Sequence, residues 1–340
     1  MNARPVKPLP VVAIVGATGA VGLELIRCLE ERRFPLAELR LFASARSAAR
    51  TLGFRGAQLP VRELREDSFG GVNLALFSAG ASTSRRFAPL AVAAGATVVD
   101  NSSAYRMDET VPLVVPEINP QSLATHRGIV ANPNCCAIIS ITPLWPIHSA
   151  NRIVRLQMAT YQAASGAGAA AMEELRESTR AYLDGRDHTP RVLPHPYAFN
   201  LFSHNTRVDP VSGYNEEELK VVHETRKIFA DPAIRVAATC VRVPVLRAHA
   251  MAITFECERP ISAAEARALL ARAPGVRLVD DPERNHFPMP RDATGQDAIL
   301  VGRVRQDLSD PSGHSVSLFV AGDQLLKGAA LNAVQIAELL

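Results

Sequence analysis

The chain has 340 residues, enough for about two domains with a large core and a ligand cleft. Hydrophobic residues make up 47% and charged residues 21%, and 37 Lys and Arg against 34 Asp and Glu leave a net charge of +3. A small module held together by disulfides or metal is excluded by this length. The even spread of charge gives no reason to expect nucleic acid or a membrane surface as a partner.

The cysteines and the first residues indicate where the protein works. The five cysteines are an odd set without Cys-x-x-Cys spacing, and residues 1–10 lack the apolar segment of an export signal. No apolar run reaches the roughly 18 residues that a membrane-spanning helix needs. We therefore expect a reduced, cytoplasmic protein that binds no metal.

The first elements predict a nucleotide-binding turn. A β-branched strand over 11–15 is followed by Gly16, Gly19 and Gly22, and then by a stretch with apolar residues at helical spacing. Glycines between a strand and a helix let the backbone approach a pyrophosphate, and the helix N-terminus supplies free N–H groups. The alternative is a tight turn without a ligand.

Further strands are predicted over 39–44, 73–80 and 96–100, with an Ala-rich helix between the last two. Strands that alternate with helices predict a parallel, doubly wound sheet. An NAD site usually has Asp or Glu after its second strand, whereas this chain has Ser44 and Arg46. A hydroxyl and a guanidinium suit a 2′-phosphate, which favours NADP, unless Arg46 is an ordinary loop arginine. Ser78 and Gly80 are placed to contact the cofactor.

The second half of the chain has a different pattern of apolar and polar residues. A helix to about residue 150 is followed by alternating runs over 152–164, 234–245, 250–258, 298–305 and 314–321, which predict a mixed, largely antiparallel sheet. Residues 180–215 are expected to be irregular. The tail 327–340 is expected to pack as a helix against the first domain. The predicted domains are 1–132, completed by 322–340, and 133–321.

Cys135 is the candidate nucleophile. It follows Asn132-Pro133-Asn134 at the start of a predicted helix, where the helix dipole and free N–H groups lower a thiol pKa. Consecutive helical residues point about 100° apart, so Cys136 is interpreted as packing. The other three cysteines are interpreted in the same way.

The second half also offers charged partners. Arg242 and His249 flank an apolar strand, where an arginine can clamp a carboxylate and a histidine can exchange a proton. Asn215 with Glu218 forms a possible capping box. Glu217 and Lys220 share a helix face, either as a site or as a solvent-exposed ion pair. Arg106 is either a phosphate clamp or a surface charge.

These motifs occur together in one family. The chain resembles the aspartate-β-semialdehyde dehydrogenases over nearly its whole length. The resemblance rests on GATGAVG (16–22), SARS (44–47), DNSSAYRMD (100–108), PNC (133–135), YQAASGAG (161–168), the helix with Glu217 and Lys220, CVRVPV with His249, and GDQLLKGAALNAVQIAE (322–338).

The resemblance implies a Rossmann NADP-binding domain and an α+β catalytic and dimerisation domain. It implies reversible, NADPH-dependent reduction of L-aspartyl 4-phosphate to L-aspartate 4-semialdehyde through a cysteine thioester, in lysine, methionine and threonine biosynthesis, by a homodimer or homotetramer. It makes Cys135 the nucleophile and His249 the acid/base catalyst, with Gln162 orienting the acyl intermediate and Asn134 beside the nucleophile.

It also implies the binding residues. Arg242 would hold the substrate α-carboxylate, Glu217 the amino group, and Lys220 with Arg106 the phosphate. The implied NADP contacts are Gly16, Thr18, Gly19, Ala20, Val21, Gly22, Ser44, Arg46, Ser47, Ser78, Gly80, Ser165, Gly166, Ala167 and Gln324.

The sequence departs from the family pattern at three places. His249 lies between Ala248 and Ala250 where Gly-His-Ser is common, which leaves the hydrogen bond that orients its ring undefined. Cys136 replaces a usual Ser or Thr, and Gln324 a usual Asn. The alternatives are an N-acetyl-γ-glutamyl-phosphate reductase, whose substrate has no free ammonium for Glu217, and a non-catalytic NADP-binding paralogue.

Overall fold

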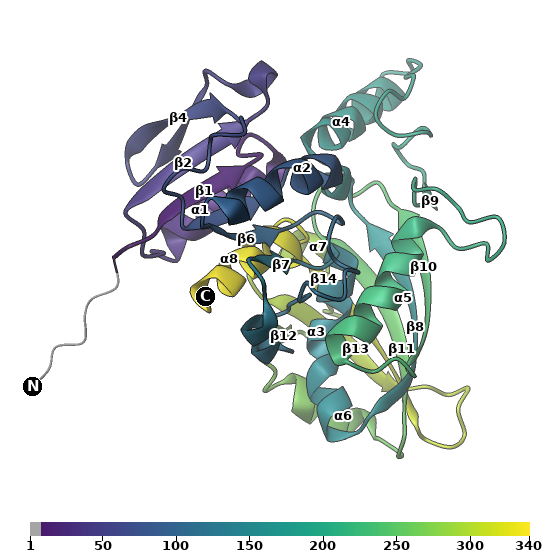
Figure 1. Cartoon of the computed structure of the whole chain (residues 1–340). Helices are drawn as coiled ribbons and strands as arrows, with labels where there is room; N and C mark the ends of the chain where they lie inside the picture. The colour runs from purple at the N-terminus through teal and green to yellow at the C-terminus, as the bar shows by residue number, and fades with distance from the viewer. Residues whose placement is uncertain (1–7) are drawn as a thin grey trace, which may run out of the picture. The chain divides into compact units, whose positions relative to one another are not determined.

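The computed structural model describes residues 8–340 (Figure 1), which divide into two units. The first unit comprises the described residues up to Val114, Pro120–Asn132 and Ala330–Leu340. The second comprises Val115–Asn119 and Pro133–Ala329. None of the helices over these described residues is long and apolar enough to cross a membrane.

The first unit is a doubly wound sheet with the strand order β3-β4-β2-β1-β5-β6-β7. All neighbours are parallel except β3 and β4, which form an antiparallel hairpin. The central strands are apolar on both faces, as buried parallel strands are, and Phe69 stacks on Phe77 in the core with ring centroids 5.9 Å apart. The strands are β1 (Val11–Val15), β2 (Glu38–Ala43), β3 (Thr51–Phe54), β4 (Ala57–Glu63), β5 (Leu74–Phe77), β6 (Thr97–Asp100) and β7 (Ile129–Ala131).

The helices of this unit include the C-terminal tail. The tail helix α8 (Leu331–Glu338) packs against α1 (Ala20–Glu31), and Arg32 pairs with Glu338 at 2.6 Å. Residues Ala330–Leu340 thus belong to the first unit, whereas the segment before them belongs to the second. The tail is not one continuous α-helix, because Leu326–Ala330 form a π-helical turn before α8. The remaining helix, α2 (Ala81–Ala93), packs on β5 and β6.

The second unit has a mixed sheet with the order β12-β13-β14-β11-β8-β10-β9. The pairs β8–β10 and β12–β13 are parallel and the others antiparallel, so the predicted fold class is confirmed. The strands are β8 (Ile153–Gln162), β9 (Phe202–Ser203), β10 (Arg235–Arg242), β11 (His249–Cys257), β12 (Val276–Leu278), β13 (Ile299–Gln306) and β14 (Ser315–Gly322).

Helices cover one face of this sheet. Helices α3 (Cys135–Ala150), α5 (Glu216–Phe229) and α6 (Ala263–Leu270) lie against the strands on the same side (Figure 1). The apolar residues of α3 are distributed around the whole helix, which is typical of a fully buried helix. Two further helices, α4 (Ala169–Leu183) and α7 (Pro290–Ala293), complete the unit. Because β8 alternates buried and exposed residues, its other face remains open.

Candidate active site

Cys135 is the first residue of α3, in the position that the sequence predicts. Asn134 caps this helix, and its Oδ1 accepts the backbone N–H of Cys136 at 2.8 Å and that of Ala137 at 3.3 Å. The backbone N–H of Asn134 donates to the buried Glu224 carboxylate at 2.5 Å. The nucleophile candidate is therefore held at a helix N-terminus by two anchors on its preceding residue.

Three reactive side chains meet at this point. The sulfurs of Cys135 and Cys136 and a ring nitrogen of His249 all lie within 4.8 Å of one another. A hydrogen bond from the Cys136 thiol, with the charge and hydrogen bond of His249, lowers the pKa of Cys135 well below its usual value despite burial. Burial and the neighbouring Cys135 sulfur raise the pKa of Cys136. Cys135 is thus the group that ionises.

Cys136 has a role in addition to the packing that the sequence analysis expects. Its side chain is fully buried, whereas Cys135 is partly exposed, but its thiol is the hydrogen-bond donor that most strongly stabilises the Cys135 thiolate. The 100° rule describes the directions of the Cβ atoms and does not separate two sulfurs that lie side by side. These three groups also have the chemistry of soft-metal ligands; that no metal binds stays a prediction from the sequence.

Removal of the Cys136 thiol should raise the pKa of Cys135. In Cys136→Ala, we expect the pH profile of Cys135 alkylation by iodoacetamide to move to higher pH, because the thiolate loses a donor. Activity at neutral pH should fall by less than about tenfold, since the nucleophile remains. Cys136→Ser keeps a donor and is the matched control. An unchanged profile in Cys136→Ala would show that the contact does not affect ionisation.

His249 begins β11 and is 0% exposed. Its Nδ1 accepts the backbone N–H of Ala163 at 3.0 Å, so the neutral ring carries its proton on Nε2. The buried Nε2 is then the ring atom that can form the hydrogen bond to the Cys135 sulfur. The ring is thus oriented by a backbone group, and the hydroxyl that Ala250 lacks is not needed for this purpose.

The residue before His249 has an unusual backbone. Ala248 has a φ of 70°, a left-handed conformation that favours glycine. Its N–H donates to Oε1 of Gln324 at 2.9 Å, and the Gln324 Nε2 bonds to the Ser165 hydroxyl. The amide of Gln324 therefore joins the residue before His249 to the turn after β8. Cofactor contacts by Gln324 and Ser165 stay predictions.

Glu217 lies in the first turn of α5 and is 5% exposed. One carboxylate oxygen accepts from Asn134 Nδ2 at 2.9 Å and from Gln162 Nε2 at 3.3 Å, and the other lies 3.2 Å from Lys220 Nζ. Burial raises the pKa of Glu217, but His204, Lys220 and Asn134 together lower it to about 2. The ion pair is therefore part of a buried cluster and not a solvent-exposed pair.

Arg242 ends β10 and is also buried. Its Nη1 donates to the Ala163 carbonyl at 3.1 Å and its Nε to Asn205 Oδ1 at 3.2 Å. In the first unit, Arg106 is buried and donates to the carbonyls of Asn132 and Asn101. The second unit thus brings together Cys135, His249, Gln162, Asn134, Glu217, Lys220 and Arg242, while Arg106 is held within the first unit.

Four neighbours of this cluster were not predicted from the sequence. His204, Asn205 and Thr206 lie in the irregular segment. Asn205 contacts Arg242, Thr206 contacts the start of α5, and His204 contacts Thr206. Glu224 lies two helical turns after Glu217 and binds the Asn134 backbone. The spacing of seven between the two glutamates places them on one helix face, which is the signal that the sequence offered.

The glycine turn of the first unit has the shape of a phosphate cradle. A Cβ at Gly16 would lie 2.3 Å from the Ser78 carbonyl oxygen, and one at Gly22 would lie 2.2 Å from the Gly16 oxygen. Helix α1 starts after Gly19 without a side-chain cap, so its first N–H groups face the turn. The turn has room only for glycine, and it fits a dinucleotide.

The other predicted cofactor residues lie near strand ends or in short turns. Arg46 is exposed in the turn after β2 and has no ion-pair or hydrogen-bond partner within the described part of the chain. Thr18, Ala20 and Val21 lie in the glycine turn and the start of α1, Ser44 and Ser47 flank Arg46, Ser78 and Gly80 follow β5, and Ser165, Gly166 and Ala167 lie in the 3₁₀ turn after β8.

Comparison with known proteins gives the family. A semialdehyde dehydrogenase NAD-binding domain matches residues 11–126, and a semialdehyde dehydrogenase dimerisation domain matches residues 144–327. The chain is 55% identical to aspartate-semialdehyde dehydrogenase of Synechocystis sp. over 98% of each chain, and 46% identical to that of Bacillus subtilis over 96% of each.

Solved structures agree with this result. Aspartate semialdehyde dehydrogenase II of Vibrio cholerae, complexed with ASA, has a TM-score of 0.95 and 44% identity, covering 98% of each chain. An aspartate semialdehyde dehydrogenase of Candida albicans with NADP has a TM-score of 0.76 at 23% identity, which shows a shared fold. By both sequence and fold, the chain belongs to the aspartate-semialdehyde dehydrogenase family.

Proposed function

We propose that this protein catalyses the reversible, NADPH-dependent conversion of L-aspartyl 4-phosphate to L-aspartate 4-semialdehyde and phosphate, in lysine, methionine and threonine biosynthesis. One observation carries the proposal: a low-pKa thiol and a histidine share a buried cluster with Glu217, Lys220 and Arg242. The substrate has an ammonium, a phosphate and a carboxylate. These three side chains provide a complementary charge for each.

The first half of the reaction forms a thioester. The Cys135 thiolate attacks the acyl carbon, the bond between this carbon and the phosphate oxygen breaks, and phosphate leaves toward Lys220. Phosphate binding by Arg106 stays a prediction from the sequence. Glu217 binds the ammonium group and Arg242 the α-carboxylate, so the acyl carbon is presented to the sulfur. Gln162 and Asn134 both donate hydrogen bonds to the Glu217 carboxylate and keep that side chain in place.

The second half uses the Nε2–H of His249. NADPH, when bound, supplies the hydride that reduces the thioester to a hemithioacetal. The Nε2–H donates to the developing oxyanion and shares its proton with that oxygen. The proton is back on Nε2 when the carbonyl re-forms and the bond between carbon and sulfur breaks, so the semialdehyde leaves and the Cys135 thiolate is restored. The hydrogen bond from the Ala163 N–H to Nδ1 keeps the ring in the orientation that this transfer needs.

The preference for NADP over NAD is proposed from the turn after β2. Arg46→Ala should weaken NADPH binding about 10- to 100-fold by removing a charged hydrogen-bond partner, with NADH changed by less than about twofold. The arginine is exposed and unpaired within residues 8–340, so its loss should not disturb the fold. Dissociation constants from nucleotide fluorescence measure both. Equal losses for NADPH and NADH would contradict the assignment.

Phosphate-dependent reduction of NADP by L-aspartate semialdehyde tests the reaction. The expected result is activity with this substrate and none with N-acetyl-L-glutamate semialdehyde, because the latter has no ammonium for Glu217. The reverse preference would support the alternative reductase. A folded protein that binds NADP and oxidises neither semialdehyde would support a non-catalytic paralogue.

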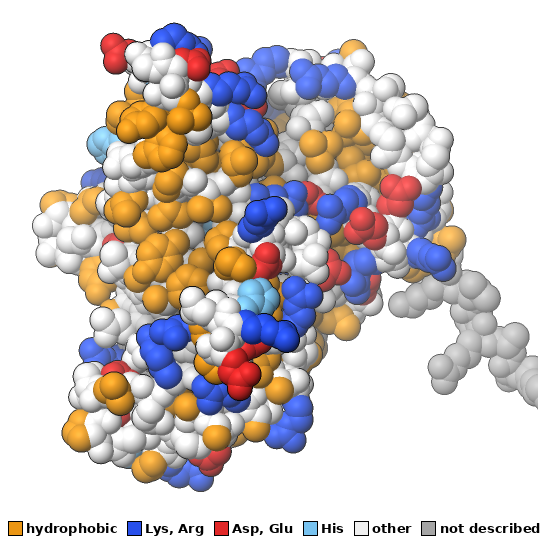
Figure 2. All heavy atoms as spheres, turned by 180° about the vertical axis from the view of Figure 1, so that it is seen from behind, with side chains coloured by type: hydrophobic (Ala, Val, Ile, Leu, Met, Phe, Trp, Pro, Cys, Tyr) orange, Lys and Arg blue, Asp and Glu red, His pale blue; other side chains and the backbone are white. Residues whose placement is uncertain are grey.

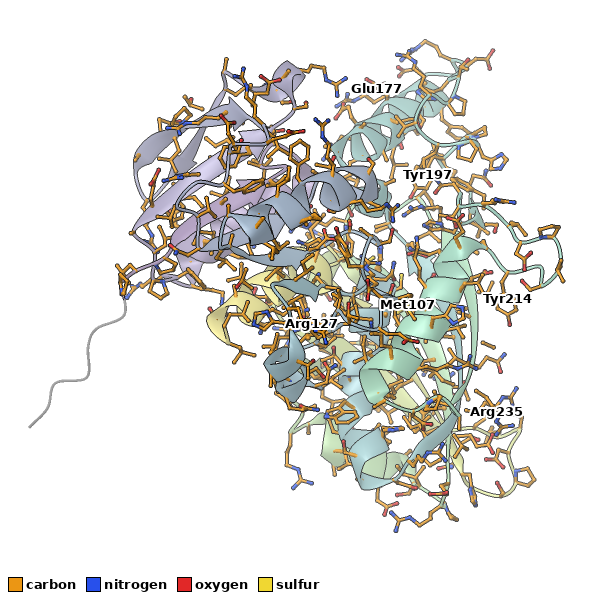
Figure 3. The ribbon with its side chains drawn as sticks, viewed as in Figure 1. Met107, Arg127, Glu177, Tyr197, Tyr214 and Arg235 are labelled. Atoms are coloured by element: carbon orange, nitrogen blue, oxygen red, sulfur yellow. The ribbon has the colours of Figure 1, made fainter. Side chains whose placement is uncertain are left out.

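We propose that the open face of the second sheet is the contact between copies in a homodimer. This face is hydrophobic over a wide area (Figure 2) and contains a hollow of about 610 Å³. Tyr214, which Figure 3 labels, lies just before α5. It lines the hollow with Ala159, Ala252 and Leu318. Sedimentation should give twice the chain mass of 36.6 kDa, or four times for a tetramer, and the mass of a single chain would contradict the proposal.

The five cysteines of the chain are all free thiols, which agrees with the cytoplasmic location that we propose.

A further inference from the structure

We propose that His204 is a substrate-binding residue whose neutral imidazole donates a hydrogen bond from Nε2 to the α-carboxylate held by Arg242. This inference rests on the proposed function and adds a residue to its substrate site. It is carried by the segment His204-Asn205-Thr206, which lies outside all the motifs that the sequence analysis singled out.

The backbone places His204 beside Arg242. Strand β9 pairs with the end of β10, with Phe202 opposite Arg242, and the His204 N–H donates to the Cys240 carbonyl at 2.9 Å. His204 is therefore on the strand next to the one that carries Arg242, just beyond the last strand pair. Its side chain is buried, with 7% of the residue exposed.

The two residues that follow contact two of the residues proposed to bind the substrate. Asn205 Oδ1 accepts from Arg242 Nε at 3.2 Å, and Thr206 Oγ1 accepts from the Glu217 N–H at 3.2 Å. The segment thus joins the end of β10 to the start of α5. His204 precedes both contacts on the excursion that also carries Tyr197 (Figure 3).

A chain of hydrogen bonds defines the proton on His204. Because Thr206 Oγ1 accepts from the Glu217 backbone, its own hydroxyl proton can be donated to His204 Nδ1, 3.2 Å away. The proton of the neutral ring then lies on Nε2. In the described part of the chain, Nε2 has no hydrogen-bond partner and remains available to a ligand.

The surrounding charges keep this ring neutral. Burial, together with Arg242, Lys220 and His249, lowers the pKa of His204 to about 4, against the opposing effect of Glu217. A neutral donor adds a directed hydrogen bond to a carboxylate whose charge Arg242 already balances. It also leaves the Glu217 carboxylate free for the ammonium group of the same substrate.

Steady-state kinetics of the full protein test this role. His204→Phe should raise KM for L-aspartate semialdehyde at least about tenfold, because a hydrogen bond to a charged group is lost. We expect kcat to change by less than about threefold and KM for NADP to stay unchanged. His204→Gln, which keeps an N–H donor, should recover most of the affinity. His223→Phe, an exposed histidine on α5, is the matched control and should behave as the parent.

The following results would overturn the inference. An unchanged KM in His204→Phe would exclude the contact, and equal losses in the Phe and Gln variants would exclude the donor. A merely structural role would lower kcat and the melting temperature and shift the pH profile of Cys135 alkylation. If His204→Phe does not fold, His204→Met, which also lacks an N–H, replaces it. A parent without activity on the semialdehyde would refute the proposed function, and this inference with it, whereas an active parent isolates the His204 result.

Discussion

Cys135→Ala should abolish phosphate-dependent reduction of NADP by L-aspartate semialdehyde, with kcat at least about 10⁴-fold lower, because no other group can form the thioester. Cys136 lies beside it but is fully buried, and its pKa is raised. It should therefore not replace the missing nucleophile. Initial rates at saturating substrate give the comparison, and circular dichroism confirms that the variant is folded.

The control for this prediction is Cys136→Ala, which keeps the nucleophile and should retain activity. A covalent label supplies a second measurement: iodoacetamide at neutral pH should modify Cys135 in the parent, and mass spectrometry of peptides should find Cys136 unmodified. Substantial activity in Cys135→Ala, or labelling of Cys136 in the parent, would contradict the assignment of Cys135 as the nucleophile.

Much of the fold follows from local sequence patterns. In the first unit, the glycine turn and the buried apolar strands are each recognisable from a short stretch of sequence. In the second unit, the alternation of apolar and polar residues predicts the strands in the same way. The β3–β4 hairpin was missed because its turn is Arg55-Gly56, with φ of 49° and 79°, and not the usual Asn-Gly or Asp-Gly pair. The π-helical turn before α8 was missed because its apolar residues continue a helical period.

The site was only partly predictable for a different reason. Cys135, Glu217 and Arg242 were singled out because their residue types at helix starts and strand ends suggest chemistry. His204 and Glu224 have roles that depend on tertiary contacts, since each binds or adjoins a residue far away in the chain. Cys136 shows the same limit, because helix geometry gives the direction of a side chain but not the partner that its sulfur finds.

Gly166 shows how the backbone holds two functional groups together. A Cβ at this position would lie 2.9 Å from Arg242 Nη1 and 2.9 Å from His249 Cε1. Both neighbours are buried and are tied to Ala163, through its carbonyl and its N–H respectively. Neither side chain can move away without breaking its hydrogen bond to the Ala163 backbone. The positions of Arg242 and His249 therefore require that residue 166 has no side chain.

Gly166→Ala should therefore lower kcat/KM about 10²- to 10³-fold, since a displacement of about 1 Å in catalytic groups costs this much. Gly70→Ala, at an exposed glycine with no atom within 4 Å of the added Cβ, is the control and should match the parent. Because Gly166 is also a predicted cofactor contact, a readout without cofactor is needed to separate the two roles. His249 lowers the pKa of Cys135, so displacement of its ring should move Cys135 alkylation to higher pH in the cofactor-free protein. A parent-like alkylation profile with lost activity would instead mean that the added methyl group acts on cofactor binding.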